Sequence, residues 1–305
     1  MNGRKIWMNG DLYNWDEAKI HVLTHALHYG TGVFEGIRCY KSGKRYAVFR
    51  LHDHICRLIQ SGKMYYMDFQ YSDLEIEQAV LEIIRANGLD EWYIRPIAYY
   101  GYGKMGVNPL PNKVSVSIAL WKWDEYFKSN SKNEGIRVLT SSWLRIDNRC
   151  MPMRAKAAAN YANSALARVE AIKAGYDEAI MLNLQGMVIE GTAENIFAVK
   201  NKTIITPPIS SGALDGITRD SILTICKNHD MDIEIRDLAR DELYSADEVF
   251  LSGTASQIKS IAEIDSRVVG SGKVGTVTKK LQEYYEKIVR GKGGKLSETW
   301  LTYVN

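Results

Sequence analysis

The sequence has 305 residues, of which 46% are hydrophobic and 25% are charged. This length predicts two domains, and the composition is close to the globular average, which excludes a disordered, collagen-like or coiled-coil chain. The net charge of +3 comes from 39 basic and 36 acidic side chains spread evenly along the sequence. With no basic domain or tail, we expect no binding to nucleic acid.

The first third of the chain is predicted to form strands with one or two helices. A hairpin is expected at the start, because Asn9-Gly10 separates two short apolar segments. A second hairpin is expected where VFEGIRCY and RYAVFR flank residues 41–44. The apolar residues that follow have helical spacing, which predicts a helix beginning at Leu51.

The clearest helix is predicted over 72–87. Ser72 and Glu75 form an S-x-x-E capping box at its start, and Gly88 ends it. Its predicted apolar stripe comprises Leu74, Ile76, Val80, Ile83 and Ile84. Two strands, WYIRPIAYYGYG and KVSVSIALW, are predicted next, the second from its alternation of apolar and polar residues.

A polar segment without periodicity, residues 123–134, is the predicted interdomain linker. It separates a small N-terminal α+β domain, 1–122, from a large C-terminal domain, 135–305. The C-terminal domain is predicted to mix strands and helices, which are the strand IRVLTSS, the helix NYANSALARVEAIKAG, the strands AIMLN, VIEG and NIFAVK, a helix over 218–228, a strand over 248–251 and the terminal helix TVTKKLQEYYEKIV.

The four cysteines, Cys39, Cys56, Cys150 and Cys226, are far apart and show neither a C-x-x-C motif nor Cys/His pairs at metal-ligand spacing. We therefore expect buried thiols in a reducing compartment and no metal site. The N-terminus has no apolar signal region, and no run approaches the ~18 apolar residues that a membrane span needs. These features predict a cytoplasmic protein without a membrane partner.

Residues 101–106, GYGKMG, fit the pattern G-x-G-x-x-G after a predicted strand. A nicotinamide-dependent oxidoreductase is therefore a distant alternative. That fingerprint requires a helix to begin at the last glycine, so that the helix N-terminus binds the pyrophosphate. Pro109 and Pro111 exclude a helix at this point, and we expect a loop.

Three places are candidates for binding phosphate. Gly216 precedes a predicted helix whose first backbone amides belong to Ile217 and Thr218. The turn at 253–255 follows a strand and is a candidate anion nest, and Arg57 is a candidate countercharge. Each also has an ordinary structural explanation, namely a helix cap, a turn and a solvated arginine.

Lys156 lies among small residues in RAKAAANY. Most lysines are solvated surface charges, but one that is desolvated by its neighbours is a candidate Schiff-base nucleophile. Glu190 and Glu194, in VIEGTAEN, follow a strand that we expect to be buried, where a carboxylate can meet a ligand cation. A lysine, a carboxylate and phosphate-binding turns are together the groups that pyridoxal 5′-phosphate (PLP) requires.

Seven segments along the chain are typical of one enzyme family: HALHYGTGVFEGIRCY, YIRPI, KMGVNP, RAKAAANY, VIEGTAENIF, GITRD and FLSGTA. In this order they make the sequence resemble the class IV aminotransferases, and among them the branched-chain amino acid aminotransferases, over nearly the whole chain. The resemblance implies an α+β protein of PLP fold type IV. Its smaller domain would be an α/β sandwich and its larger domain would have a barrel-like β core, with PLP held in a cleft where they meet.

The resemblance assigns the cofactor contacts residue by residue. Lys156 would bind PLP covalently and later carry the proton between the substrate Cα and the cofactor. Glu190 would pair with the pyridine nitrogen, and Tyr161 would hydrogen-bond the ring oxygen. The phosphate would be held by Arg57, Ile217, Thr218 and Thr254.

The resemblance also implies a substrate pocket with an apolar wall and a polar end. The wall positions are matched by Phe34, Tyr93, Trp123 and Tyr126. Tyr29 and Val107 match positions that come from the neighbouring subunit, which implies a homodimer or higher homo-oligomer with shared active sites. Arg95 would accept the distal carboxylate of glutamate. The substrate α-carboxylate would be bound by the backbone amides of Gly253, Thr254 and Ala255.

The activity implied is transamination between L-leucine, L-isoleucine or L-valine and 2-oxoglutarate, which gives branched-chain 2-oxo acids and L-glutamate. All three amino acids are expected to be accepted, because one methylene changes binding by only about 1 to 3 kcal/mol. A D-amino acid aminotransferase or an aminodeoxychorismate lyase of the same fold is the first alternative, although FEGIR and YIRPI favour the branched-chain group. A non-catalytic PLP-binding protein is a further alternative.

Overall fold

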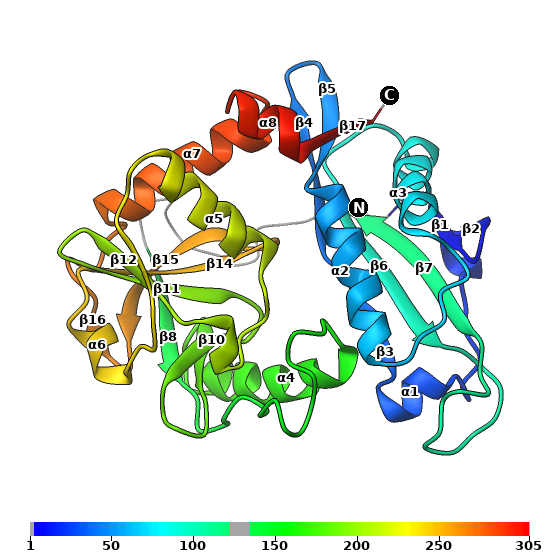
Figure 1. The fold of residues 1–305 in the computed structure, drawn as a ribbon, viewed down its shortest axis with the longest axis horizontal. Helices are drawn as coiled ribbons and strands as arrows, with labels where there is room; N and C mark the ends of the chain where they lie inside the picture. Colours follow the sequence, from blue (N-terminus) through cyan, green and yellow to red (C-terminus); the bar gives the residue numbers. More distant parts are fainter. Residues whose placement is uncertain (1–2, 123–134, 305) are drawn as a thin grey trace. The chain divides into compact units, whose positions relative to one another are not determined.

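The computed structural model describes residues 3–122 and 135–304, which form two compact units (Figure 1). The first unit contains the described chain up to residue 122, together with Ala155–Ala159 and the C-terminal segment from Lys287 onward. The second contains residues 135–154 and Asn160–Glu286. This division differs from the predicted ranges, because two later segments pair with strands of the first unit. The predicted linker lies outside the described residues.

An eight-stranded sheet forms the centre of the first unit, in the order β17-β5-β4-β6-β7-β1-β2, with β3 paired to β6. The strands are β1 (Lys5–Met8), β2 (Asp11–Asn14), β3 (Gly32–Phe34), β4 (Ile37–Ser42), β5 (Arg45–Phe49), β6 (Tyr93–Tyr100), β7 (Val114–Trp121) and β17 (Leu301–Val304). The helices are η1 (Trp15–Glu17), α1 (His25–Tyr29), α2 (Leu51–Met64), α3 (Asp73–Asn87) and α8 (Lys295–Trp300).

The local signals in this unit are confirmed. Asn9 and Gly10 both have positive φ, 51° and 100°, as a two-residue hairpin turn requires. The Ser72 and Glu75 side chains make the reciprocal capping box at the start of α3. Leu74 is the exception in the predicted stripe: it is 64% exposed, because it lies in the first turn of α3, outside the face that packs on the sheet.

Helices α2 and α3 bury their apolar faces with the sheet in one core. The core residues of α2 include Leu51, Ile55 and Leu58, all 1% exposed or less. C-terminal strand β17 continues this sheet by pairing antiparallel with β5. Sequence patterns did not predict β17, since four residues at a chain end carry too weak a period-2 signal.

A closed six-stranded barrel forms the centre of the second unit. The pairing order is β10-β9-β8-β15-β14-β11, and β11 pairs back to β10 to close the ring. The strands of the unit are β8 (Ile136–Thr140), β9 (Glu178–Leu182), β10 (Val188–Gly191), β11 (Asn195–Lys200), β12 (Thr203–Thr206), β13 (Ile233–Ile235), β14 (Glu248–Gly253), β15 (Gln257–Ile264) and β16 (Arg267–Val268). The predicted barrel-like core is therefore confirmed.

The other helices described are α4 (Ala158–Lys173), η2 (Ile209–Ser211), α5 (Ile217–Asn228), α6 (Arg240–Tyr244) and α7 (Thr276–Val289). Alternate barrel residues from all six strands share one apolar core. On the opposite face of β11 and β14, Phe197 and Phe250 stack at 4.8 Å between ring centroids. Strands buried on both faces read as continuous apolar runs, which is why NIFAVK was recognised. Strand β15 was missed because its sequence, QIKSIAEI, interrupts the apolar pattern with charges.

The sequence predicts that all four cysteines are buried. Cys39 and Cys226 are buried, but Cys56 is half-buried and Cys150 is exposed, so the prediction of four buried thiols is wrong for the last two. Cys150 lies in an irregular segment at the surface, outside any helix or strand.

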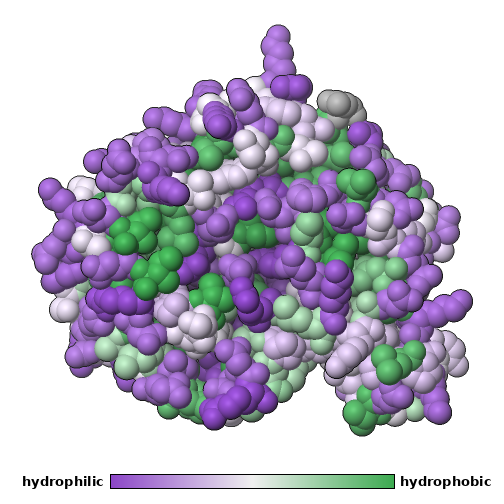
Figure 2. Space-filling view, in the orientation of Figure 1, coloured by the Kyte–Doolittle hydropathy of each residue, from purple (hydrophilic) through white to green (hydrophobic). Residues whose placement is uncertain are grey.

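The face drawn in Figure 2 is mainly hydrophilic, with apolar residues in separate patches. Within the described residues, no helix combines the length and hydrophobicity that a membrane span requires.

A buried ion pair joins α2 to the segment between β3 and β4. Glu35 is 0% exposed, and its carboxylate accepts hydrogen bonds from Arg57 Nε at 2.6 Å and from Arg57 Nη2 at 2.9 Å. His54 Nδ1 lies 2.7 Å from the same carboxylate. Burial alone would raise the pKa of Glu35, but the charge of Arg57 and the hydrogen bonds from His54 and Arg57 outweigh it and hold the pKa well below its ordinary value.

We expect Glu35→Gln to lower the free energy of unfolding of the first unit by about 3 to 5 kcal/mol, because it leaves the Arg57 charge buried without its partner. The Glu35 pKa is lower in the folded than in the unfolded chain. The ion pair therefore contributes fully above the ordinary value of 4.5 and loses its contribution as the pH falls below it. The difference between wild type and variant should shrink in acid, as measured by urea denaturation followed by circular dichroism at neutral and acidic pH.

Asp147→Asn is the matched control, because Asp147 pairs with an exposed Arg149 and surface ion pairs contribute little. Equal stability of Glu35→Gln and wild type at neutral pH would contradict the assignment of Glu35 as a stabilising anion.

Candidate functional site

In the first unit, the backbone of Lys156 is held by two segments distant in sequence. Its N–H donates to Ser61 Oγ at 3.0 Å, and its carbonyl accepts from the Phe34 N–H at 3.0 Å. The neighbouring residues Ala155 and Ala157 are buried, at 1% and 0% exposure. Small side chains at these positions let the segment pack closely, as the sequence suggested, and helix α4 begins two residues later.

The Lys156 side chain lies near aromatic residues of the predicted substrate wall. Its Nζ is 5.1 Å from the centroid of the Phe34 ring. Arg95, on β6, lies over the same ring at 4.7 Å and near the Tyr93 ring at 5.6 Å. The structure thus brings together four of the predicted residues, and Trp121, which was not predicted, adds a further ring 5.1 Å from Tyr93.

Arg95 has an incomplete set of hydrogen bonds. Its Nε is buried and has no hydrogen-bond partner among the described residues. A buried guanidinium N–H without an acceptor is costly. This geometry suits a ligand carboxylate, which the family resemblance places at Arg95.

Arg57, predicted to bind phosphate, is held by the buried pair with Glu35 described above. It lies one helical turn before Ser61, the residue that binds the Lys156 backbone. The charge of Lys156 also acts on His54 and contributes to lowering its pKa, after the larger effect of burial. Arg57 and Lys156 therefore belong to the same region of the first unit.

In the second unit, Glu190 is buried at 4% exposure and receives three donors. Arg145 Nη2 lies 2.8 Å from its Oε1. Its Oε2 accepts from the Leu214 N–H at 3.1 Å and from Asn195 Nδ2 at 3.3 Å. A carboxylate offers about four lone-pair sites, so Glu190 retains capacity for one more donor, as a protonated pyridine nitrogen would supply.

Glu194, the other acid of this motif, has a different environment. It is 3% exposed, and burial together with the nearby Glu178 and Glu190 raises its pKa well above the ordinary value. Between two carboxyls with contrasting environments, the geometry favours Glu190, because only Glu190 is paired with Arg145.

The N-terminus of α5 lies beside the Glu190 site. A Cβ atom on Gly216, the N-cap residue, would lie 1.9 Å from Asn195 Oδ1, so only glycine fits this approach. The first intrahelical bond is from the Asp220 N–H to the Gly216 carbonyl at 2.9 Å. The Thr218 amide therefore belongs to the first turn, where helix N–H groups can bind an anion.

The turn at 253–255 joins β14 to β15 and lies next to Glu194. A Cβ atom on Gly253 would be 3.2 Å from Glu194 Cγ. Strand register places Ser252 opposite Asn195. The hydroxyls of Ser252 and Ser256 are buried and have no hydrogen-bond partner among the described residues. Unpartnered hydroxyls around this turn fit a polar ligand, and Ser256 was not among the predicted residues.

Other predicted residues are placed individually. Tyr161 is half-buried on α4. Tyr29 and Val107 are 40% and 82% exposed. Trp123 and Tyr126 lie outside the described residues.

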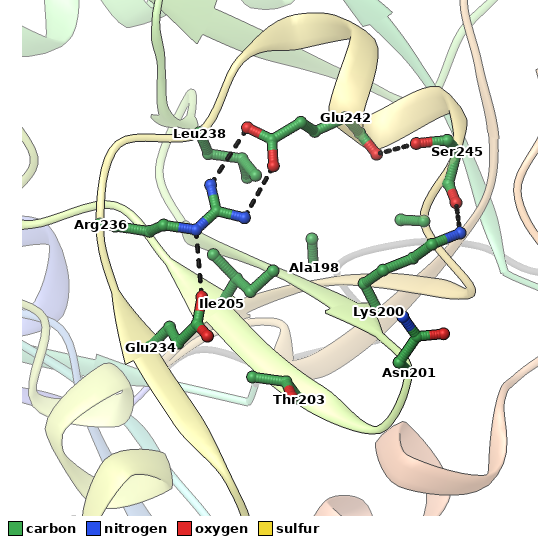
Figure 3. Close-up of a pocket in the computed structure, with 11 residues that line it drawn as sticks. Ala198, Lys200, Asn201, Thr203, Ile205, Glu234, Arg236, Leu238, Glu242 and Ser245 are labelled. Carbon is green, nitrogen blue, oxygen red and sulfur yellow. Dashed lines mark hydrogen bonds and ion pairs between the residues drawn. The ribbon is translucent and has the colours of Figure 1, made fainter.

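The second unit also has a cavity of about 250 Å³ beside β11, β12 and α6 (Figure 3). Its charged groups are already paired: Arg236 binds Glu242 at 2.7 Å and Glu234 at 3.1 Å, and Lys200 donates to the Ser245 carbonyl. No predicted site residue lines it. We therefore do not assign it to the cofactor.

Several residues that surround Lys156, Arg57 or Glu190 are not predicted from the sequence. Glu35 lies within FEGIR, and Asn195 directly follows EGTAE, so both stood inside quoted motifs. His54 lies three residues before Arg57, at helical spacing, which was an available signal. Ser61 and Arg145 carry no local pattern, because their partners are distant in sequence.

Comparisons with known proteins agree with this arrangement. The family model of class IV amino-transferases matches residues 32–264. The branched-chain-amino-acid aminotransferase of Pseudomonas aeruginosa is 44% identical over 299 residues, which cover 98% of this chain and 97% of that protein.

Solved structures match over the same length. The branched-chain amino acid aminotransferase of Escherichia coli has a TM-score of 0.96 and 42% identity, covering 99% of this chain and all of that chain. The enzyme of Thermobaculum terrenum, solved in its PLP form, has a TM-score of 0.93 and 36% identity, covering all of this chain and 99% of that chain. Because the family model matches most of the chain and relatives 42–44% identical match it over nearly its whole length, the chain belongs to the class IV aminotransferases.

Proposed function

We propose that this protein is a PLP-dependent branched-chain amino acid aminotransferase. It would exchange the amino group between L-leucine, L-isoleucine or L-valine and 2-oxoglutarate. Two groups of residues carry the proposal. In the first unit, Lys156 and Arg95 both lie near the Phe34 ring. In the second unit, the Glu190 carboxylate is paired with Arg145.

The residues fit the cofactor. When bound, PLP supplies an electron sink for the negative charge that develops at the substrate Cα. Glu190 would hold a proton at the pyridine nitrogen, and Arg145 Nη2 lies 2.8 Å from this carboxylate. Lys156 would bind the cofactor and then move the proton from the substrate Cα. Tyr161 would donate to the ring oxygen.

Phosphate binding is proposed for the residues to which the family resemblance assigns it. The amides of Ile217 and Thr218, at the N-terminus of α5, would donate to it, with the Thr254 hydroxyl and the Arg57 guanidinium. The Glu35 carboxylate fixes the orientation of Arg57 through two hydrogen bonds.

Two chemically different substrates would use one pocket. Phe34 and Tyr93, with Trp123 and Tyr126, would form the wall for an aliphatic side chain. Arg95 would bind the distal carboxylate of glutamate or 2-oxoglutarate through groups that include its unpartnered Nε. The substrate α-carboxylate would be bound by Gly253, Thr254 and Ala255.

The alternatives within this fold are less well supported. Relatives over nearly the full chain are named branched-chain-amino-acid aminotransferases, which does not favour a D-amino acid aminotransferase or an aminodeoxychorismate lyase. The oxidoreductase alternative required a helix after GYGKMG, and residues 101–113 contain none.

Lys156→Ala should abolish covalent PLP binding and transamination, because it removes both the attachment point and the proton carrier. Absorbance before and after borohydride treatment and L-leucine turnover with 2-oxoglutarate would measure this. Lys173→Ala, at the end of α4, is the matched control. A Lys156→Ala protein that still retained reducible PLP on the chain would contradict the assignment, and exclusive turnover of D-alanine by wild type would contradict the proposed function.

Arg95→Gln should raise the KM for 2-oxoglutarate by about 10- to 100-fold, the amount expected for losing a charged hydrogen bond, and leave the KM for L-leucine nearly unchanged. Steady-state kinetics with each substrate varied would show this difference. Equal effects on both substrates would indicate that Arg95 only supports the packing of Phe34.

Assembly would complete the site. Tyr29 and Val107 belong to one surface, because α1 and the 101–113 loop are joined by His25 Nε2 to the Gly106 carbonyl at 2.7 Å. Leu27 and Tyr102 are also more than 60% exposed there. These apolar side chains support a homodimer or higher homo-oligomer with shared active sites.

We also propose a cytoplasmic location. All four cysteines are free thiols, which supports a reducing compartment.

Val107→Asp should weaken self-association and reduce turnover together, because a charge would be buried at the contact. Sedimentation velocity and L-leucine turnover over a range of protein concentrations would test this. Leu89→Asp, at an exposed apolar position just after the end of α3, is the control. A monomeric Val107→Asp variant with full activity would exclude sharing of the active site.

A further inference from the structure

Helices α2 and α3 place a histidine, a cysteine and a carboxylate together at the surface of the first unit. His52 and Cys56 are one helical turn apart on α2, and Asp73 begins α3. One ligand atom from each lies within 4.8 Å of the other two. Among residues 3–122 and 135–304, no other three His, Cys, Asp or Glu side chains form such a group.

The spacing of the first two ligand atoms matches that of a bound metal ion. His52 Nε2 is 3.4 Å from Cys56 Sγ. Around tetrahedral Zn²⁺, a nitrogen at about 2.05 Å and a sulfur at about 2.3 Å are separated by about 3.6 Å. His52 and Cys56 are therefore a Cys/His pair at metal-ligand spacing, contrary to the expectation from the sequence that the cysteines have no such partner. Their i, i+4 spacing on one helix sets this edge without rearrangement of the backbone.

The other nitrogen of His52 is already oriented. Its Nδ1 lies 2.8 Å from Glu77 Oε1, and Glu77 is one turn after Asp73 on α3. A carboxylate that binds Nδ1–H fixes the tautomer that leaves the Nε2 lone pair available for a metal. Metal-binding histidines commonly have such a partner, so this bond is a second observation besides the ligand cluster.

Charge at this place also favours a cation. The Asp73 carboxylate is part of the cluster, and the Glu77 carboxylate lies against His52, so negative charge is present where the ion would bind. His52 is 65% exposed, which leaves a path for an ion and room for a water molecule as a fourth ligand. A thiolate and an imidazole select zinc-like ions over calcium or magnesium, which prefer oxygen ligands.

We propose that His52 Nε2, Cys56 Sγ and an Asp73 carboxylate oxygen bind one Zn²⁺-class divalent ion that links α2 to α3. Glu77 orients His52 and does not itself bind the ion. The ion has a structural role, joining two helices of the first unit. This site is independent of the proposed function, because none of its residues contacts substrate or cofactor in that proposal.

The test uses purified, PLP-loaded protein freed of metal by chelation and then dialysed against ZnCl₂. Wild type should bind about one Zn²⁺ per chain more than Cys56→Ser, as measured by elemental analysis. Glu77→Gln should retain the site with about 10-fold weaker affinity, the usual effect of losing an orienting partner. Cys150→Ser, which removes an exposed thiol elsewhere, should bind as wild type.

Alkylation of the wild-type protein supplies a second readout that does not depend on a variant folding. Zn²⁺ should slow the modification of Cys56 by iodoacetamide and leave that of Cys150 unchanged, as followed by mass spectrometry. Equal Zn²⁺ binding by wild type and Cys56→Ser, or no protection of Cys56, would overturn the proposal and show that the cluster is only a hydrogen-bonded surface network. Transamination activity would be unaffected by that outcome.

Discussion

The closure of the barrel and the construction of the candidate cofactor site depend on one buried carboxylate. Strand β10 meets β11 at Glu190 and Asn195, and this is the pairing that closes the ring. The same two side chains are joined by a hydrogen bond, and Arg145 neutralises the carboxylate at 2.8 Å. A buried charge without such partners would cost several kcal/mol. The fold can therefore tolerate Glu190 only where the donors are supplied.

The pairing of Glu190 with Asn195 also determines where neighbouring segments lie. Asn195 lies close to Gly216, which brings the N-terminus of α5 to the site, and register places Ser252 beside Asn195. The α5 terminus and the turn after β14 thus take their positions from barrel strands, which are rigid elements. A cofactor site supported in this way needs little rearrangement to bind its ligand.

In the first unit, another buried carboxylate positions residues of the candidate site. Glu35 binds Arg57 of α2, and α2 also holds the Lys156 backbone through Ser61. The lysine segment is thereby fixed in a sheet-and-helix core far from it in sequence.

Local structure and the type of chemistry could be predicted from the sequence alone. Turn residues such as Asn9-Gly10, the Ser72 capping box and the apolar runs of the barrel strands act between near neighbours, so their outcome was predictable. The motifs also predict Lys156 and Glu190 as cofactor-binding residues. The groups that surround these residues were settled by the folded chain: Arg145 for Glu190, Glu35 for Arg57, and Asp73 beside His52 and Cys56. Strands β15 and β17 likewise depend on pairing with distant strands. A contact between distant residues leaves no periodic signal in the sequence, because its free energy exists only after the chain has folded.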